Sequence, residues 1–160
     1  DPDAAIALSL LHALPDLTAA AVDVSAAALK VARENADHFG LTDRVMFYEG
    51  DLLAPLRGQT FDAVLSNPPY IPREDIAALP PEVQAEPRLA LDGGADGLDF
   101  YRRLVREAAA FLCPGGFLAV EAGQGEAVVI SELARTNGWL EVEITKDLAG
   151  IDRVVTMRRG

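Results

Sequence analysis

Short apolar runs alternate with segments of helical periodicity along the chain, and this alternation limits the possible folds more than any other feature. Runs typical of buried strands occur at residues 18–24, 45–48, 61–65 and 117–122. Helical spacing of apolar residues occurs at residues 3–14, 25–39, 98–112 and 126–136. The alternation predicts an α/β fold with a mostly parallel sheet and helices on both of its faces.

Caps and apolar stripes define the predicted helices more closely. The first helix follows Asp1 and Asp3, which can cap its start, and the second begins at Ser25 and ends near Gly40. The predicted inward faces are Ile6, Leu10, Leu11 and Leu14 in the first helix, Leu29, Ala32, Ala36 and Phe39 in the second, and Phe100, Tyr101, Leu104, Val105, Ala108 and Phe111 in a later one. Glu141 to Thr145 and Val154 to Met157 are predicted to form a final antiparallel pair.

Length and charge narrow the class of protein. The 160 residues are enough for one domain with a real core, so residues 1–160 are interpreted as a single domain. The formal charge of −11 disfavours direct binding to nucleic acid, and no apolar run is long enough to span a membrane. Cys113 has no second cysteine to pair with, which favours a reducing, cytoplasmic setting and a place in the core.

Polar residues follow the first two predicted strands, where ligands of open α/β sheets bind. Asp23 can accept two hydrogen bonds from a ribose diol, although it can also serve as a helix-start residue before Ser25. After the second strand, Gly50 allows a turn, and Asp51 can accept a hydrogen bond from an exocyclic amine of adenine. A solvated carboxylate in a turn is the other interpretation of Asp51.

The third strand is followed by Ser66-Asn67-Pro68-Pro69-Tyr70, the strongest signal in the chain. Two prolines fix two φ angles and remove two donors, and Asn67 is pushed towards extended geometry because a proline follows it. The resulting rigid loop presents an amide oxygen, a free carbonyl and an aromatic ring. That set suits an NH2 group as a methyl acceptor, whereas the alternative is an ordinary proline-rich turn.

These motifs, in this order, resemble the HemK/PrmC family of protein-glutamine methyltransferases. The resemblance covers nearly the whole chain and includes residues 21–25, 32–36, 49–53, 66–72, 86–98, 114–116 and 147–154. The stretch from Glu86 to Leu98 is more specific for this family than Asn-Pro-Pro-Tyr, which adenine-directed DNA methyltransferases share. The resemblance implies a Rossmann-like class I fold that uses S-adenosylmethionine and releases S-adenosylhomocysteine.

The resemblance also implies roles for individual residues. Asp23 would hold the ribose, and Asp51 with Leu52 would hold the adenine. Asn67 and Pro68 would grip the glutamine amide of a Gly-Gly-Gln motif in a peptide chain release factor, with Pro69 and Tyr70 against it. Asn67, Pro68 and Tyr70 are thus the predicted catalytic residues, and Asn67 would also contact the cofactor. The stretch from Glu86 to Gly97 would lie near the substrate entrance or serve as a surface cover.

The chain departs from the family at its start. Asp1-Pro2-Asp3-Ala4-Ala5 stands where the family has a Gly-rich turn, and the strand and helical domain expected before it are not in this sequence. The expectation is therefore an N-terminally incomplete catalytic domain with its first strand missing. Ribosomal-protein glutamine or adenine-N6 methylation, or a non-catalytic fragment that has lost cofactor binding, are the alternatives. The sequence predicts no metal site and leaves the oligomeric state unknown.

Overall fold

The computed structural model describes residues 2–160, which form two compact units. Unit 1 comprises residues 1–58 and unit 2 comprises residues 59–160. Asp1, one of the two predicted helix caps, lies outside the described residues, as does the side chain of Asp3, the other. Among the helices that are described, none combines the length and apolar character needed to cross a membrane.

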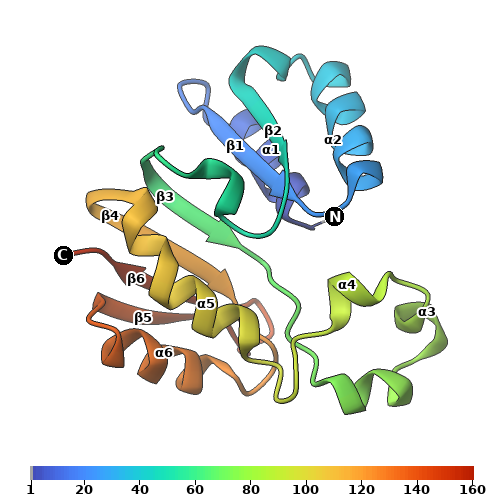
Figure 1. Ribbon diagram of the computed structural model, residues 1–160, viewed down its shortest axis with the longest axis vertical. Coiled ribbons are helices and arrows are strands. Elements are labelled where there is room, and N and C mark those ends of the chain that lie inside the picture. The colour runs from blue at the N-terminus through green and yellow to red at the C-terminus, as the bar shows by residue number, and fades with distance from the viewer. Residues whose placement is uncertain (1) are drawn as a thin grey trace. The chain divides into compact units, whose positions relative to one another are not determined.

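Unit 1 is a two-stranded parallel sheet with two helices (Figure 1). Its elements are α1 (Pro2–Ala13), β1 (Ala19–Asp23), α2 (Ala26–His38), η1 (Thr42–Arg44), β2 (Val45–Glu49) and η2 (Ala54–Leu56). Ser25 caps α2 as predicted, because its hydroxyl accepts a hydrogen bond from the Ala28 N–H at 3.2 Å. The core of the unit consists of Leu8, Leu11, Ala21, Ala36, Leu41 and Val45.

Unit 2 contains a four-stranded mixed sheet in the order β3-β4-β6-β5. Its elements are β3 (Phe61–Ser66), η3 (Arg73–Ala78), α3 (Pro81–Gln84), α4 (Arg88–Leu91), α5 (Asp99–Glu107), η4 (Ala108–Phe111), β4 (Leu112–Glu121), α6 (Ala127–Thr136), β5 (Leu140–Lys146) and β6 (Asp152–Arg158). β3 and β4 are parallel, whereas β6 is antiparallel to both of its neighbours. The α/β class and the final antiparallel pair predicted from sequence are therefore confirmed.

The segment between β3 and α5 leaves the sheet of unit 2 and returns to it. It carries η3, α3 and α4, which lie away from the strands (Figure 1). The rest of the unit packs around fully buried side chains, namely Tyr101, Leu104, Leu112, Leu118, Ile130, Val155 and Met157. Trp139 joins this core, and its indole N–H donates to the Val105 carbonyl at 2.8 Å. We call residues 73–91 the excursion.

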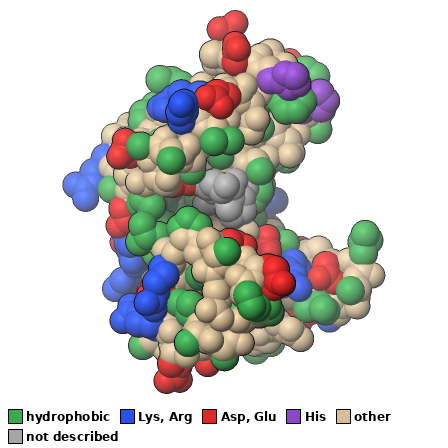
Figure 2. Space-filling view, turned by 90° about the vertical axis from the view of Figure 1, so that its right-hand side faces the viewer, with side chains coloured by type: hydrophobic (Ala, Val, Ile, Leu, Met, Phe, Trp, Pro, Cys, Tyr) green, Lys and Arg blue, Asp and Glu red, His purple; other side chains and the backbone are tan. Residues whose placement is uncertain are grey.

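Several predicted core positions are more exposed than expected. Leu14 is 51% exposed because α1 ends at Ala13, and Phe39 is 56% exposed because it follows the last turn of α2. Phe39 instead contacts the rings of His12 and His38 edge to face, and histidine side chains lie beside hydrophobic ones in Figure 2. The predicted inward face of α1 is thus wrong except at Leu11, because Ala4, Leu8 and Leu11 are its buried residues, whereas Ile6 and Leu10 are only half-buried.

Further burial predictions, for two phenylalanines, one cysteine and two strands, need correction. Phe100 and Phe111 are only half-buried, and Phe111 lies in the 3₁₀ helix η4, where the α-helical phase no longer applies. Cys113, expected in the core, is also half-buried. β1 and β3 are not buried throughout, because each pairs with one strand within its own unit, and Leu65 of β3 is 39% exposed.

Arg44 closes the connection between α1 and β1. Its guanidinium donates to the Leu11 carbonyl at 2.6 Å, the Leu14 carbonyl at 3.0 Å, the Pro15 carbonyl at 2.9 Å and the Leu17 carbonyl at 3.2 Å. Carbonyls at the end of a helix have no partner within the helix, and they carry the negative end of its dipole. A cation placed here therefore satisfies the end of α1 and fixes the turn that leads into β1.

Replacement of Arg44 by methionine should destabilise unit 1. The methionine keeps much of the apolar stem but donates no hydrogen bond, so we expect a loss of about 2 kcal/mol in the free energy of unfolding. Urea denaturation followed by circular dichroism measures this loss. Arg57→Met, at an exposed position of the same unit, is the control and should change stability by less than about 0.5 kcal/mol. Equal effects of the two substitutions would contradict the role given to Arg44.

Candidate active site

The Asn-Pro-Pro-Tyr loop leaves the carboxyl end of β3. Ser66, the last residue of β3, is buried, as is Pro68, while Asn67, Pro69 and Tyr70 are half-buried. The side-chain oxygen of Asn67 is shielded from solvent. Extended backbone and two fixed φ angles leave this loop little conformational freedom, so its polar groups are held in place before any ligand binds.

Main-chain hydrogen bonds tie the end of this loop to residues 91–94. Ile71 forms a parallel bridge with Asp92: the Ile71 N–H donates to the Leu91 carbonyl at 3.1 Å, and the Gly93 N–H donates to the Ile71 carbonyl at 2.8 Å. The Arg73 guanidinium also pairs with the Asp92 carboxylate at 2.9 Å, and this contact lowers the pKa of Asp92. The excursion is therefore closed at its base.

Two glycines allow the returning chain to lie directly on Tyr70. A Cβ at Gly93 would lie 2.8 Å from the Tyr70 carbonyl carbon, and one at Gly97 would collide with the Tyr70 carbonyl oxygen. Gly97 also has a φ of +81°, a backbone conformation that residues other than glycine rarely adopt. The stretch Asp92 to Gly97 thus serves as a close-fitting support for the Asn-Pro-Pro-Tyr loop. Whether it also borders the substrate entrance stays a prediction.

A half-buried glutamate with one buried carboxyl oxygen lies close to the same loop. Glu126 follows the turn after β4, and a Cβ at Gly123 would lie 2.6 Å from its Oε2 and 2.7 Å from Cδ2 of Tyr70. Burial raises the pKa of Glu126 to about 7; the Gly123 N–H opposes this shift and Asp96 adds to it. Burial also raises the pKa of Tyr101, whose hydroxyl donates to the Glu121 carbonyl at 2.6 Å.

Unit 1 brings its two predicted acidic sites together at the carboxyl ends of β1 and β2. Asp23 is the register partner of Glu49, and its main-chain carbonyl accepts from the Gly50 N–H at 2.9 Å. One carboxylate oxygen of Asp23 accepts from the Ser25 N–H at 2.6 Å, so the helix-start role proposed for it is real. A carboxylate has two oxygens and several acceptor positions, so this bond does not preclude a ligand.

Leu52 stands next to the exposed carboxylate of Asp51 and has a φ of +48°. A leucine with a left-handed backbone is under strain, and such residues concentrate at ligand sites. Gly50 is needed for a different reason, because a Cβ there would lie within 3.1 Å of the Pro55 ring. The turn from Gly50 to Leu52 is therefore held in one specific conformation.

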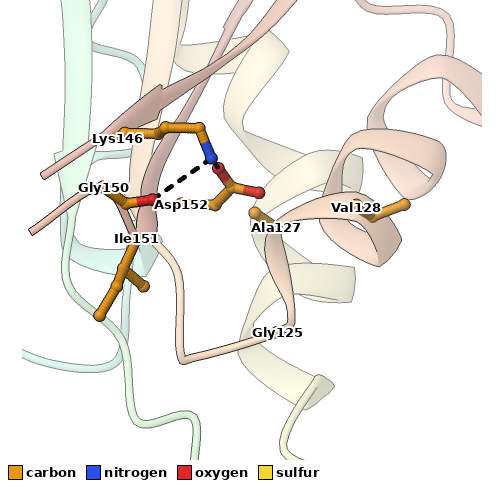
Figure 3. Close-up of a pocket in the computed structure, with 7 residues that line it drawn as sticks. All are labelled: Gly125, Ala127, Val128, Lys146, Gly150, Ile151 and Asp152. Carbon is orange, nitrogen blue, oxygen red and sulfur yellow. Dashed lines mark hydrogen bonds and ion pairs between the residues drawn. The ribbon is translucent and has the colours of Figure 1, made fainter.

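The described residues of unit 2 line at least two cavities. One, of about 330 Å³, is lined by Arg73, Leu89, Asp92, Gly94, Asp99, Phe100 and Arg103, beside the base of the excursion. A second, of about 250 Å³, lies between the start of α6 and the β5–β6 turn (Figure 3). There the Lys146 ammonium pairs with Asp152 at 2.6 Å, so its charge is already balanced.

Sequence reasoning missed Glu126 and the glycines that contact Tyr70. The same rule that selected Asp23, Asp51 and Asn67, namely inspection of the residues after each strand, would have directed attention to Gly123-Gln124-Gly125-Glu126 after β4. No feature of the sequence indicates that the Glu126 carboxyl is partly buried, because this burial depends on the position of residues 92–97 in the folded chain.

Comparisons with known proteins point to methyltransferases. The family model "Methyltransferase small domain" matches residues 4–79. The release factor glutamine methyltransferase of Moorella thermoacetica is 52% identical over 93% of this chain and 53% of its own length. The structure of a release factor-specific protein-(glutamine-N5) methyltransferase from Alicyclobacillus acidocaldarius is 26% identical with a TM-score of 0.51, covering 99% of this chain and 93% of that one. A methyltransferase from Pyrococcus furiosus superimposes with a TM-score of 0.69 at 21% identity, over 98% of this chain and 70% of that one.

The fold and these similarities define the class as the Rossmann-like class I fold of S-adenosylmethionine-dependent methyltransferases. Within this class, the chain is similar over nearly its whole length to curated release factor glutamine methyltransferases, in agreement with the resemblance to the HemK/PrmC family. The chain spans about half the length of the curated relatives it matches.

Two alanine substitutions test the contact between Gly97 and Tyr70. Gly97 and Gly125 both have a φ of +81°, but a Cβ at Gly125 would meet no atom within 4 Å. Gly125→Ala should therefore cost only the left-handed backbone strain, about 1–2 kcal/mol. Gly97→Ala should cost about 1–3 kcal/mol more, because the methyl group displaces the Tyr70 carbonyl. Chemical denaturation of the two variants measures the difference in their free energies of unfolding. Equal values would show that the contact between Gly97 and Tyr70 does not contribute to stability.

Proposed function

We propose that this chain carries the catalytic region of an S-adenosylmethionine-dependent methyltransferase that acts on a glutamine side chain. The acceptor would be the amide nitrogen of the glutamine in a Gly-Gly-Gln motif of peptide chain release factors. The observation that carries the proposal is the rigid Asn-Pro-Pro-Tyr loop at the end of β3, supported from behind by Gly93 and Gly97. The names of the relatives support the choice of substrate.

The loop offers the two acceptors that a primary amide requires. The Asn67 side-chain oxygen and the Pro68 carbonyl would each accept one N–H of the glutamine, while Pro69 and Tyr70 would pack against its planar group. When both N–H groups are hydrogen-bonded, the remaining electron density of the nitrogen would point towards the methyl group that is transferred. Such positioning raises the rate without any covalent enzyme intermediate, because the entropy cost of alignment is met on binding.

Unit 1 would supply the cofactor contacts. S-Adenosylmethionine offers the hydroxyls of a ribose diol and an adenine amine as hydrogen-bond donors, and the carboxylates of Asp23 and Asp51 would accept from them. Leu52, whose backbone is strained, would pack beside the adenine. Asn67 would also contact the cofactor, which supplies an electrophilic methyl group on a sulfonium centre. S-Adenosylhomocysteine would be the product.

The surface charge favours a protein substrate over a nucleic acid. The formal charge is −11, and two of the three arginines of α5, Arg102 and Arg103, pair with the carboxylates of Asp96 and Glu107 respectively. A polyanion would meet net repulsion. We therefore expect no direct binding of nucleic acid. The single cysteine and the release factor substrate together support a cytoplasmic location.

Calorimetric titration with S-adenosylhomocysteine tests the cofactor residues. We expect micromolar binding to the chain, weakened roughly 10- to 100-fold in Asp23→Ala, because a hydrogen-bonded charged acceptor contributes about 1.5–3 kcal/mol. Asp16→Ala, an exposed carboxylate in the same unit, is the matched control and should bind like the wild type. Unchanged affinity in Asp23→Ala would refute the ribose role, and a folded chain that does not bind would refute cofactor binding by this chain.

Methylation of purified release factor tests the acceptor loop. Asn67→Ala should lower kcat/KM on the order of 100-fold, since the amide loses one of two positioning contacts. Asn137→Ala, at the exposed end of α6, is the control and should keep full activity. Ribosomal protein and an adenine-containing oligonucleotide are offered in parallel. Preferential methylation of either one would overturn the assignment to release factors.

A further inference from the structure

The carboxyl group of Glu126 and the ring of Tyr70 border the same small space beside Gly123. Glu126 Oε2 and Tyr70 Cδ2 are both within 2.7 Å of the point that a Gly123 Cβ would occupy, and Glu126 Oε1 is 2.9 Å from the corresponding point at Gly97. Glycine at both positions leaves the space that the carboxyl fills. Tyr70, Gly97 and Glu126 therefore form one packed group within unit 2.

No hydrogen bond to Oε2 of Glu126 is found among the described residues, and this atom is buried. The side chains near the carboxyl are Tyr70 after β3, Asp96 before α5 and Tyr101 of α5, and the main-chain N–H of Gly123 also faces it and lowers the pKa of Glu126. The Tyr101 hydroxyl is already committed to the Glu121 carbonyl. The side chains among these neighbours are neutral or acidic, so the Gly123 N–H offsets only part of the cost of a negative charge on Glu126.

Packing of this kind favours the neutral carboxyl over the anion, because a buried charge without a counter-ion is costly. A neutral carboxyl can stay beside the Tyr70 ring, whereas the anion gains by moving towards water. Its displacement would open space behind the ring and next to the Tyr70 carbonyl. The charge state of Glu126 is thereby coupled to the position of Tyr70.

We propose that Glu126 is a positioning residue for the methyl acceptor: in its neutral form it holds the Tyr70 ring in place, and its ionisation releases the ring. This inference rests on the proposed function, in which Tyr70 packs against the glutamine amide. Glu126 itself would touch Tyr70 and the two glycines, and would act on the substrate only through the tyrosine.

NMR of chain carrying ¹³C-labelled tyrosine tests the coupling without any need for activity. The chain has three tyrosines, and Tyr70→Phe assigns the relevant signal. In the wild type we expect the Tyr70 ring resonance to shift with a midpoint at the Glu126 pKa of about 7. In Glu126→Gln, which keeps the size and lacks the charge, the resonance should stay at its low-pH position. Glu132→Gln, an exposed carboxylate on the same helix, should titrate like the wild type.

A Tyr70 resonance that does not move with pH, or that moves equally in Glu126→Gln, would overturn the proposal. The kinetic arm measures KM for release factor across the same pH range. It should rise at least about fivefold above neutral pH in the wild type and stay flat in Glu126→Gln, with kcat changing less. A pH-independent KM in the wild type would overturn the link to substrate positioning. Absence of methyl transfer, together with a titrating Tyr70 signal, would support the coupling and refute the proposed function instead.

Discussion

The contact between the Tyr70 main chain and the glycines at 93 and 97 is the constraint on which the rest of the candidate site depends. It exists only because neither glycine has a Cβ. The contact fixes the distal end of the Asn-Pro-Pro-Tyr loop, while β3 fixes its start. A loop restrained at both ends, with two prolines between, needs little reorganisation to receive a ligand, and the polar groups of Asn67 and Pro68 keep their directions.

Unit 1 positions its acidic residues by strand register and main-chain hydrogen bonds instead of by close packing on glycine. Parallel register aligns Asp23 with Glu49, and the hydrogen bond from Gly50 to the Asp23 carbonyl extends this alignment into the following turn. The strain at Leu52 is maintained by these surrounding contacts. Arg44 stabilises the opposite end of β1 by satisfying the carbonyls that precede it. Secondary-structure ends, rather than element interiors, therefore carry most of the specific polar interactions in this unit.

The sequence predicted those features that depend on neighbours in the chain. The cap at Ser25, the buried face of α2 at Leu29, Ala32 and Ala36, and the final antiparallel pair all follow from local periodicity and were confirmed. The prediction that Phe39 is buried was wrong, because Phe39 follows the last turn of α2 and its side chain no longer points along the buried face of the helix. The space beside Gly123 that Glu126 and Tyr70 share brings together residues 56 positions apart, and the pKa of Glu126 is raised by burial. No pattern in one sequence encodes that combination.

The hydrogen bonds at the base of the excursion constrain the residues at its two ends, but they do not constrain the residues in its middle. Residues 71 and 73 are bonded to residues 91–94, so the path between them can change in length or composition while the loop before it stays in place. Selection would then act on the two regions at different rates. The base and the family-specific stretch from Glu86 onwards would be nearly invariant, whereas residues 74–85 would be free to diversify, and homologues could acquire new protein substrates by exchanging this segment.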